Sequence, residues 1–290
     1  MSKIYVYPYT TGSESARLLA DRLDALRIRL ENSTYVHKPD NIVVNWGSSS
    51  CPHPCLNPSH LLKDTVNKLR FFRKMSELGL RSSLPNYWTD ASEIPQSAYP
   101  VLCRTKVEGM DGAGIVIANN REELVSAQLY TKLIEGCTEY RVTLFKGYGV
   151  TDVQLKKERA SAVNPHPFIK TYANGWGFVR VHTFPVELTE FASKILDATG
   201  LDFAGLDIVR TPTGHFKVLE VNSAMGLEGQ ALDNFAKAVE WYVDKRNGDM
   251  VIQATQHAED AEEEPMHIKI QEALDSHNYA EVIRCAAQMI

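Results

Sequence analysis

The stretch from residue 205 to residue 223 constrains the fold of this chain more than any other feature. Two apolar, partly β-branched runs flank a polar turn, a pattern that predicts a β-hairpin. Because side chains alternate between the two faces of a strand, Glu220 and Asn222 share one face, and Asp207 can converge with them from the first strand. Such an all-oxygen set suits Mg²⁺, with Mn²⁺ as an alternative, and Mg²⁺ usually leaves positions for substrate phosphates. Carboxylates on a hairpin also often cover a solvated face, so the hairpin alone leaves both interpretations open.

Composition narrows the class of protein. The 290 residues are 44% hydrophobic, enough to bury a core in about two or three compact units. The formal net charge of −5 provides no broad basic field, so a nucleic-acid partner is not indicated, although a local basic groove stays open. No apolar run approaches the roughly twenty residues of a membrane span, and no signal peptide opens the chain, so we expect a cytoplasmic protein without a membrane partner. Five cysteines, an odd number, favour reduced thiols. A homo-oligomer is left open.

The first sixty residues predict a small α/β domain. Strands are expected at residues 3–8 and 41–47, with an amphipathic helix at residues 16–30 between them. Ligands of α/β sheets tend to bind at the C-terminal ends of the strands.

A cysteine-rich loop follows this domain. Cys51, His53 and Cys55 allow an alternative interpretation of the chain as a zinc-binding interaction module. Structural zinc usually takes four ligands from paired motifs, and no second Cys or His pair follows nearby, which speaks against this alternative.

The next segment combines a helix with a glycine-rich turn. Helical spacing predicts a helix at residues 60–80 that contains Lys68. A buried strand then ends in Arg104. Two apolar runs follow, joined by a turn with three glycines, Gly109, Gly112 and Gly114. Glycine permits unusual φ angles and lets backbone N–H groups approach phosphates. A glycine-rich hairpin is common by itself, and no P-loop motif occurs in the chain.

Two charged strands are expected in the second half. Glu139 and Arg141 lie on one face of the first strand, and Gln154 and Lys156 share a side of the second. Without their neighbours, Glu139 and Arg141 are best explained as a cross-strand ion pair on an exposed face. Residues 164–177 show no clear period and predict a loop. Helices are expected at residues 121–129, 188–199 and 231–246.

The loop after Asn222 completes a family pattern. Glu220-Val221-Asn222 is followed by Gly226-Leu227-Glu228-Gly229, and with Asp207 this sequence resembles the ATP-grasp superfamily, most closely the RimK-type carboxylate–amine ligases. One residue departs, because Met225 stands where relatives usually have Pro. The resemblance implies an α/β (α+β) ATP-grasp fold with an N-terminal small α/β domain and a C-terminal helical extension. Its parts would be residues 1–60, an ATP-grasp domain at 61–248 divided into subdomains 61–129 and 130–248, and an acidic linker with a helical tail at 249–290.

The resemblance also implies roles for individual residues. Lys68 and Arg104 would contact phosphates, with Lys106 as a second candidate, because the spacing from Arg104 to the loop is one residue longer than expected. The turn with Gly109, Gly112 and Gly114 would form a lid over the nucleotide. The adenine would lie against the backbone of Lys132, Leu133 and Ile134, and Glu139 would accept hydrogen bonds from the ribose. Arg141 and Lys156 would hold the reacting carboxylate, and the metal ligands would be Asp207, Glu220 and Asn222.

The implied activity is that of an ADP-forming carboxylate–amine ligase that uses ATP and Mg²⁺ and proceeds through an acyl-phosphate. Its partners would be a carboxylate and an amine, among them an amino acid, a peptide, a protein tail or a small acid. A catalytically inactive ATP-binding protein is the competing class, against which the complete set of metal ligands speaks.

Overall fold

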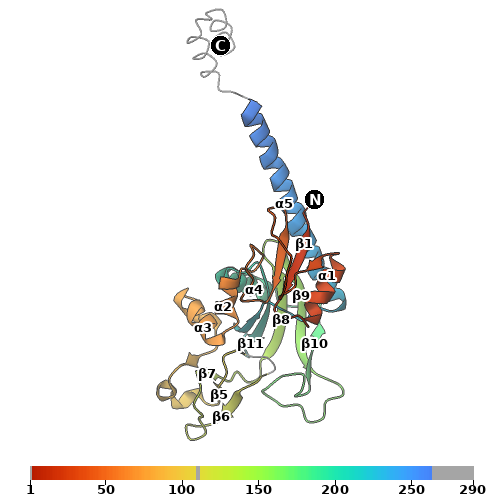
Figure 1. Cartoon of the computed structure of the whole chain (residues 1–290). Helices are drawn as coiled ribbons and strands as arrows, with labels where there is room; N and C mark the ends of the chain where they lie inside the picture. The colour runs from red at the N-terminus through yellow and green to blue at the C-terminus, as the bar shows by residue number, and fades with distance from the viewer. Residues whose placement is uncertain (1, 109–111, 263–290) are drawn as a thin grey trace, which may run out of the picture. The chain divides into compact units, whose positions relative to one another are not determined.

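The computed structural model describes residues 2–108 and 112–262, and the chain divides into two compact units, residues 1–241 and 242–290. The first unit contains three β-sheets, with α-helices against them (Figure 1). Within the described residues, no helix is both long enough and apolar enough to cross a membrane.

The N-terminal sheet is small and parallel. Its strand order is β2-β1-β3, formed by β1 (Ile4–Pro8), β2 (Leu26–Arg27) and β3 (Ile42–Trp46). Helix α1 (Glu14–Arg22) begins at Ser13, whose hydroxyl accepts a hydrogen bond from the Ala16 amide. The predicted helix at residues 16–30 was therefore wrong in its second half. The reason is local, because Asp24 has a φ of 47° and the chain then joins the sheet as β2.

The predicted helix at residues 60–80 is two helices, α2 (Ser59–Thr65) and α3 (Lys68–Glu77). Asn67 separates them, because its backbone is extended and its Oδ1 accepts a hydrogen bond from the Arg70 amide at 3.0 Å. This N-cap starts a new helix and places Lys68 in its first turn.

A second sheet is antiparallel and carries the glycine-rich connection. Its order is β4-β7-β5-β6, from β4 (Tyr87–Trp88), β5 (Val101–Arg104), β6 (Ile115–Ala118) and β7 (Leu129–Lys132). Short 3₁₀ helices lie at Arg81–Ser83, Ala91–Glu93 and Gln96–Ala98. The helix predicted at residues 121–129 was wrong. The Glu123 carboxylate instead folds back onto the amide groups of Asn119, and Leu129 already belongs to β7.

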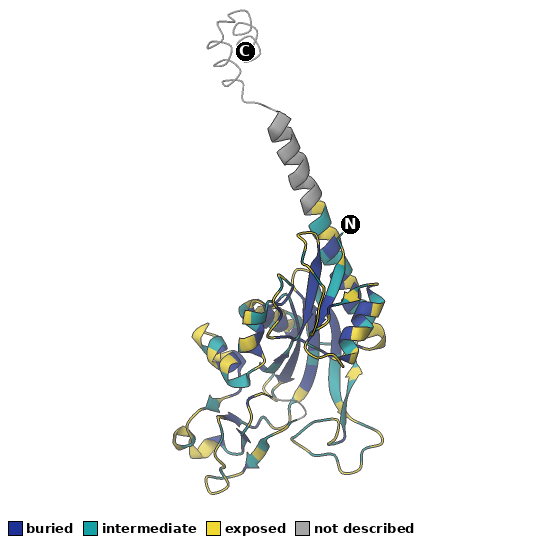
Figure 2. Cartoon of the chain, in the orientation of Figure 1, coloured by how far each residue is buried: buried dark blue, intermediate teal, exposed yellow. Residues whose placement is uncertain are grey.

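The largest sheet carries most of the polar site residues. Its order is β10-β9-β8-β11-β12, from β8 (Thr138–Phe145), β9 (Gly149–Glu158), β10 (Trp176–Arg180), β11 (Phe203–Arg210) and β12 (Phe216–Asn222). The predicted hairpin is confirmed as the antiparallel pair β11 and β12. Helix α4 (Val186–Thr199) ends at Gly200, as predicted, where the φ of 78° requires a left-handed residue. Its buried Leu188 and Ile195 share one core with Leu206 and Ile208 of β11. Figure 2 shows that the central strands of this part of the molecule are largely buried.

Helix α5 (Gly229–Glu262) follows the hairpin. Phe235 in its first half packs against the rings of Trp46, Phe145 and Phe203, with centroid distances of 5.2–6.1 Å, and so joins the N-terminal sheet to the largest one. The predicted helix at 231–246 is thus confirmed and longer. Residues 249–262, which composition predicted to belong to an acidic linker, are part of this helix. The remaining part of the predicted tail lies outside the described residues.

Candidate active site

One row of side chains crosses all five strands of the largest sheet. The strand register aligns Arg180, Gln154, Arg141, Asp207 and Glu220, in the order from β10 to β12. Residues paired in register project from the same face of a sheet. The row therefore runs from the two carboxylates predicted to bind metal to a cation on the edge strand. Asn222 pairs with Gly205 on the same face, next to this row.

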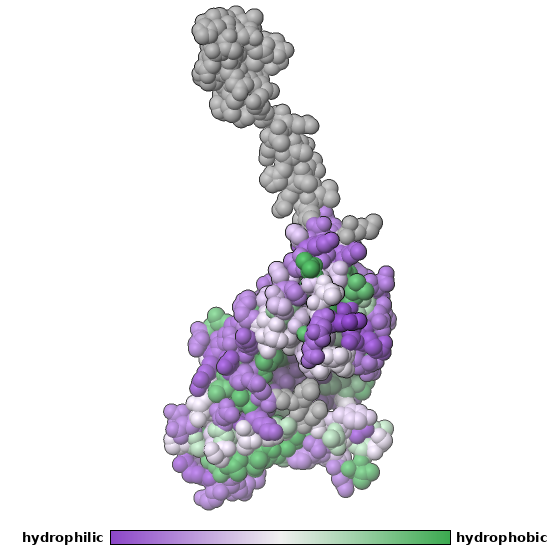
Figure 3. Space-filling model, in the orientation of Figure 1, coloured by the Kyte–Doolittle hydropathy of each residue, from purple (hydrophilic) through white to green (hydrophobic). Residues whose placement is uncertain are grey.

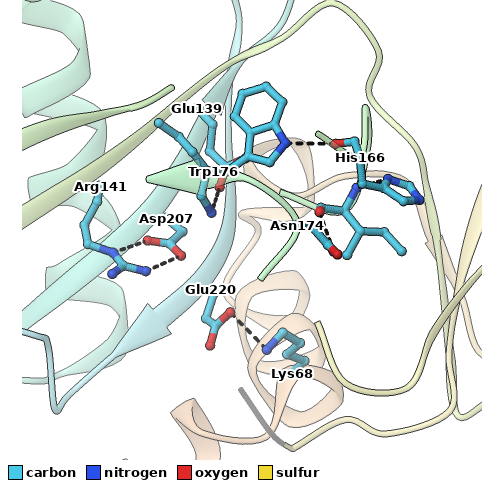
Figure 4. A network of polar contacts seen from close by, with 10 residues as sticks. Lys68, Glu139, Arg141, His166, Asn174, Trp176, Asp207 and Glu220 are labelled. Carbon is cyan, nitrogen blue, oxygen red and sulfur yellow. Dashed lines mark hydrogen bonds and ion pairs between the residues drawn. The ribbon is translucent and has the colours of Figure 1, made fainter. Parts of the chain in front are cut away.

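Each of the two carboxylates in the row forms an ion pair with a cation. Arg141 donates from Nε to Asp207 Oδ1 at 2.7 Å and from Nη2 to Oδ2 at 2.9 Å, while Lys68 Nζ lies 3.1 Å from Glu220 Oε2 (Figure 4). Burial acts to raise the pKa of Asp207, but the Arg141 guanidinium outweighs burial and holds that pKa below its usual value. Asp207 is thus kept ionised, which is the state a metal ion requires.

Glu139 has a different partner from the one its spacing suggested. Its carboxylate accepts from Lys156 Nζ at 2.7 Å, and both side chains are nearly buried, so the exposed Glu139–Arg141 pair is not formed. Burial raises the pKa of Glu139, and the charge of Lys156 only partly offsets that rise. The Phe178 ring lies under both cations, 4.2 Å from Arg141 Cζ and 4.6 Å from Lys156 Nζ.

Three adjoining cavities surround this row. The first is an apolar slot with Glu139 at its side, lined by Leu102, Leu133, Ile134, Val209 and Leu219. The second is lined by the cations Lys68, Arg104 and Lys106, together with the carboxylates Glu108 and Glu220. The third, of about 400 Å³, is lined by Arg141, Lys156, Asp207, Asn222 and Met225. Arg104 borders the first and second cavities, and Glu220 borders the second and third, so neighbouring cavities share a wall residue. Figure 3 shows a hollow in the middle of this face of the molecule.

Arg104 is the most unusual group in the second cavity. It is only 9% exposed, and its one recorded hydrogen bond joins Nε to Thr131 Oγ1 at 3.4 Å. Among the described residues, no carboxylate lies within ion-pair distance of this guanidinium. Burial lowers its pKa, while the charge of Glu220 acts in the opposite direction. A buried cation without an anion is costly, so this position favours an anionic ligand.

The remaining predicted residues are placed as follows. The backbone segment of Lys132, Leu133 and Ile134 lines the first cavity, while Lys132 Nζ points to the carbonyl of Ser97 at 3.5 Å. Gly112 and Gly114 have φ values of 71° and 76°, which L side chains rarely adopt. Gly109 lies outside the described residues.

Metal-binding geometry was predicted at two places. Within residues 2–108 and 112–262, no three His, Cys, Asp or Glu side chains are grouped to hold a metal. The set on β11 and β12 reaches three oxygen ligands only by including the amide of Asn222. Cys51 and Cys55 are free thiols, and the ring of His53 stands edge-on to Tyr35 at 4.8 Å.

Sequence reasoning missed the strand β10, whereas the loop predicted at residues 164–177 is confirmed except for Trp176 and Gly177, which belong to β10. Within that loop, His166 Nδ1 accepts from the amides of Phe168 and Ile169, and Trp176 Nε1 donates to the His166 carbonyl at 2.8 Å (Figure 4). The loop thereby positions Lys170, which lines the first and third cavities. The alternation of residues 176–180 was the available signal for β10, since Phe178 and Arg180 share a face.

Arg180 also has a partner that sequence reasoning missed. Its Nε lies 2.5 Å from Asp152 Oδ1, and the Asp152 side chain is only 3% exposed. This pair occupies the β9–β10 side of the polar face.

We expect Lys156→Gln to change the pH dependence of stability. The variant leaves the Glu139 carboxylate buried without its cation, so its pKa should rise further above the unfolded value. For such a group, the stabilising contribution is present below the unfolded pKa and is lost as pH rises through the folded pKa. The variant should lose about 2 kcal/mol at neutral pH and recover toward acid pH, measured by thermal unfolding between about pH 8 and pH 5. Lys157→Gln, next to it but exposed, is the control; identical profiles for the two variants would contradict the prediction.

We expect Gly205→Ala to displace the loop that carries Met225. A Cβ at Gly205 would lie 2.5 Å from Met225 Cγ, closer than packed atoms allow. The variant should lose about 1–3 kcal/mol of unfolding free energy, and Met225→Ala in the same chain should restore part of it. Gly226→Ala is the matched control, because nothing lies within 4 Å of its added Cβ. Additive effects of the two substitutions in urea titrations would rule out this contact.

Comparisons with known proteins identify the fold. No protein-family model matches the chain, and no curated protein matches it. Among solved structures, the ATP-grasp ligase PsnB, complexed with a variant of its minimal precursor, Mg and ADP, matches with a TM-score of 0.60 and 10% identity over 83% of this chain and 98% of that one. The D-alanine–D-alanine ligase of Bacillus anthracis has a TM-score of 0.56 and 13% identity over 85% and 100%.

A third solved structure is the RiPP-associated ATP-grasp ligase of Chryseobacterium gregarium in complex with ADP and a leader and core peptide. It matches with a TM-score of 0.56 and 13% identity over 85% of this chain and 97% of that one. These likenesses span nearly the whole of each known chain. The α/β prediction is therefore confirmed, and this chain has the ATP-grasp fold.

Proposed function

We propose that the protein is an ATP-dependent, ADP-forming carboxylate–amine ligase. The observation that carries this proposal is the adjacency of the three cavities: an apolar slot, a pocket of cations with Arg104, which has no ion-pair partner among the described residues, and a third cavity with both carboxylates and further cations. A nucleoside triphosphate and a carboxylate need these environments in this order. The likeness to ligases solved with ATP, ADP or Mg supports the choice of nucleotide and metal.

The first cavity suits a nucleoside. The apolar walls from Leu133 and Leu219 would enclose the base, and the backbone of residues 132–134 offers donors and acceptors along the edge. Glu139, at the side of the slot, would accept hydrogen bonds from ribose hydroxyls once Lys156 moves to its own ligand.

The second cavity suits the phosphates. Arg104 and Lys68 would neutralise charge on the β- and γ-phosphates, with Lys106 as an exposed third cation. Fixed cations stabilise the charge that develops during phosphoryl transfer. Asp207, Glu220 and Asn222 would hold Mg²⁺, which would supply charge neutralisation between the phosphates when bound.

The third cavity would hold the reacting acid. Arg141 and Lys156 would orient the carboxylate, whose oxygen attacks the γ-phosphorus as the bond to the bridging oxygen of ADP breaks. The amine nitrogen then attacks the acyl carbon, phosphate leaves, and the amine loses a proton. A carboxylate is a poor acyl donor, so the phosphoryl group provides the leaving group that amide formation needs. The loop at residues 226–229 supports a RimK-type enzyme within this class, and peptides are candidate substrates because related folds were solved with precursor peptides.

A trapping experiment tests the proposal. The purified chain is incubated with ATP, Mg²⁺, hydroxylamine and a panel of amino acids, acidic peptides and small dicarboxylates. We expect ADP, together with a hydroxamate, in the presence of one class of acid and no amine. AMP and pyrophosphate as products would contradict the mechanism, and ATP binding without turnover over the whole panel would favour the inactive ATP-binding protein.

A further inference from the structure

A fourth cavity lies on the N-terminal sheet and shares no lining residue with the three cavities described above. It is an open groove of about 640 Å³ beside strands β1 and β2, and its wall is formed by the segment that follows β2. Its charged lining residues are Lys3, Arg27, Arg29, Lys38 and Asp40. Four cations against one carboxylate make this groove basic, although the whole chain carries a formal charge of −5. We call it the basic groove.

The cations of the basic groove are free to meet a ligand. Among the described residues, no ion pair involves Lys3, Arg29 or Lys38, and Arg27 donates only to the carbonyl of Thr11 at 2.9 Å. Elsewhere in the same unit, by contrast, Arg17 and Arg22 each contact two carboxylates. Like charges held close together without counter-charges repel one another, and an anionic ligand removes that repulsion.

The basic groove also has a fixed aromatic wall and apolar rim. The rings of Tyr5 and Tyr35 lie 4.6 Å apart, and the Tyr35 hydroxyl is held by His37 Nδ1 at 3.1 Å and Asn41 Nδ2 at 3.4 Å. Leu26 and Val36, which also line it, are 64% and 74% exposed. Apolar side chains in these positions would gain by being covered. A ligand that carries both negative charge and apolar groups therefore fits better than a bare anion.

The backbone of β2 favours a peptide over a nucleic acid. The strand lies at the edge of its sheet, and the Ile28 amide donates to the Val6 carbonyl at 2.9 Å. In a parallel ladder with this register, the amide and carbonyl of Arg27 point away from β1. An extended peptide can pair with such an edge, whereas a nucleic acid has no matching main chain.

We propose that the basic groove binds an extended acidic segment of a partner protein, with acidic side chains on the cations and apolar ones against Leu26 and Val36. Alternate residues of an extended segment face opposite ways, so a segment in which acidic and apolar residues alternate presents each kind to one side. The proposal stands independently of the ligase chemistry, because it requires binding alone.

Fluorescence polarisation of a labelled peptide tests this. The probe alternates glutamate and valine, and the control peptide alternates glutamine and valine. We expect saturable binding of the acidic probe that weakens with salt, and little binding of the neutral one. Arg29→Glu combined with Lys38→Glu should weaken binding about tenfold or more. Arg73→Glu with Lys237→Glu changes the net charge equally at exposed positions elsewhere and should leave binding unchanged.

Three results would overturn the proposal. Equal losses in the two double variants would reduce it to general charge attraction. Displacement of the probe at lower concentration by a single-stranded oligonucleotide of equal charge would assign the groove to nucleic acid. Binding that emerges only after the acidic residues of 259–264 are replaced by glutamine would assign it to the chain's own segment. Thermal unfolding of each variant checks that the fold is retained.

Discussion

Glu220→Gln is expected to abolish the dependence of nucleotide binding on Mg²⁺. The Glu220 carboxylate stands opposite Asp207 in the β11–β12 register and borders both the second and the third cavity. An amide in its place keeps the shape but removes the negative charge that a hard cation requires. Mutation of a residue that only hydrogen-bonds to a metal ligand typically lowers metal affinity about 10–100-fold. We therefore expect that replacing Glu220, as a proposed ligand, lowers Mg²⁺ affinity about a hundredfold.

Isothermal titration of ADP in Mg²⁺ and in EDTA measures this. The natural chain should bind ADP much more tightly with Mg²⁺, and the variant should show nearly equal affinities in the two buffers. Glu228→Gln is the matched control, because Glu228 is an exposed carboxylate eight residues after Glu220 and is not among the described residues that line the three cavities. If the Glu220→Gln variant keeps the full difference in ADP affinity between Mg²⁺ and EDTA, Glu220 is not a metal ligand.

Arg104→Met is expected to weaken ATP binding about a hundredfold without lowering the stability of the empty protein. Two charge-assisted hydrogen bonds to phosphate oxygens contribute roughly 1.5 kcal/mol each, which gives that factor. In the empty protein the same guanidinium is buried with no carboxylate at ion-pair distance among the described residues, so its removal relieves a desolvation cost. Methionine fills most of the space, and the loss of the long contact to Thr131 is small.

If Arg104 binds ligand, the Arg104→Met variant loses ATP affinity and keeps the stability of the empty protein. If Arg104 is structural, the variant loses stability. Thermal unfolding with and without ATP supplies both quantities for the same sample. Lys106→Met is the control, because it removes an exposed cation from the same pocket and should cost much less affinity. A fall of more than about 2 kcal/mol in the stability of the empty Arg104→Met chain would mean that Arg104 mainly holds the fold together.

Local hydrogen bonds explain where sequence-based prediction of the elements was wrong. The hydrophobic spacing of residues 60–80 is continuous, but the side chain of Asn67 caps a new helix and breaks it. In residues 16–30 the apolar spacing also continues, yet the chain turns at Asp24 and adds β2 to the sheet. Periodicity records which residues face a core, and it does not record how the backbone reaches the next position.

The sequence by itself determined the parts of the site that rest on strand alternation. The convergence of Asp207, Glu220 and Asn222 follows from a period of two along a single hairpin, which needs no distant contact. These relations are short in sequence, so the pattern of residues contains them.

Only the tertiary structure decided the contacts between distant segments. Lys68 meets Glu220 because α3 packs next to the largest sheet. Among the described residues, Arg104 at the end of β5 is buried against Thr131 without a carboxylate at ion-pair distance. The basic groove likewise depends on the segment after β2 lying beside β1. The physical reason is that burial and unpaired charge are properties of neighbourhoods in space, and those neighbourhoods form only when the sheets and helices pack together.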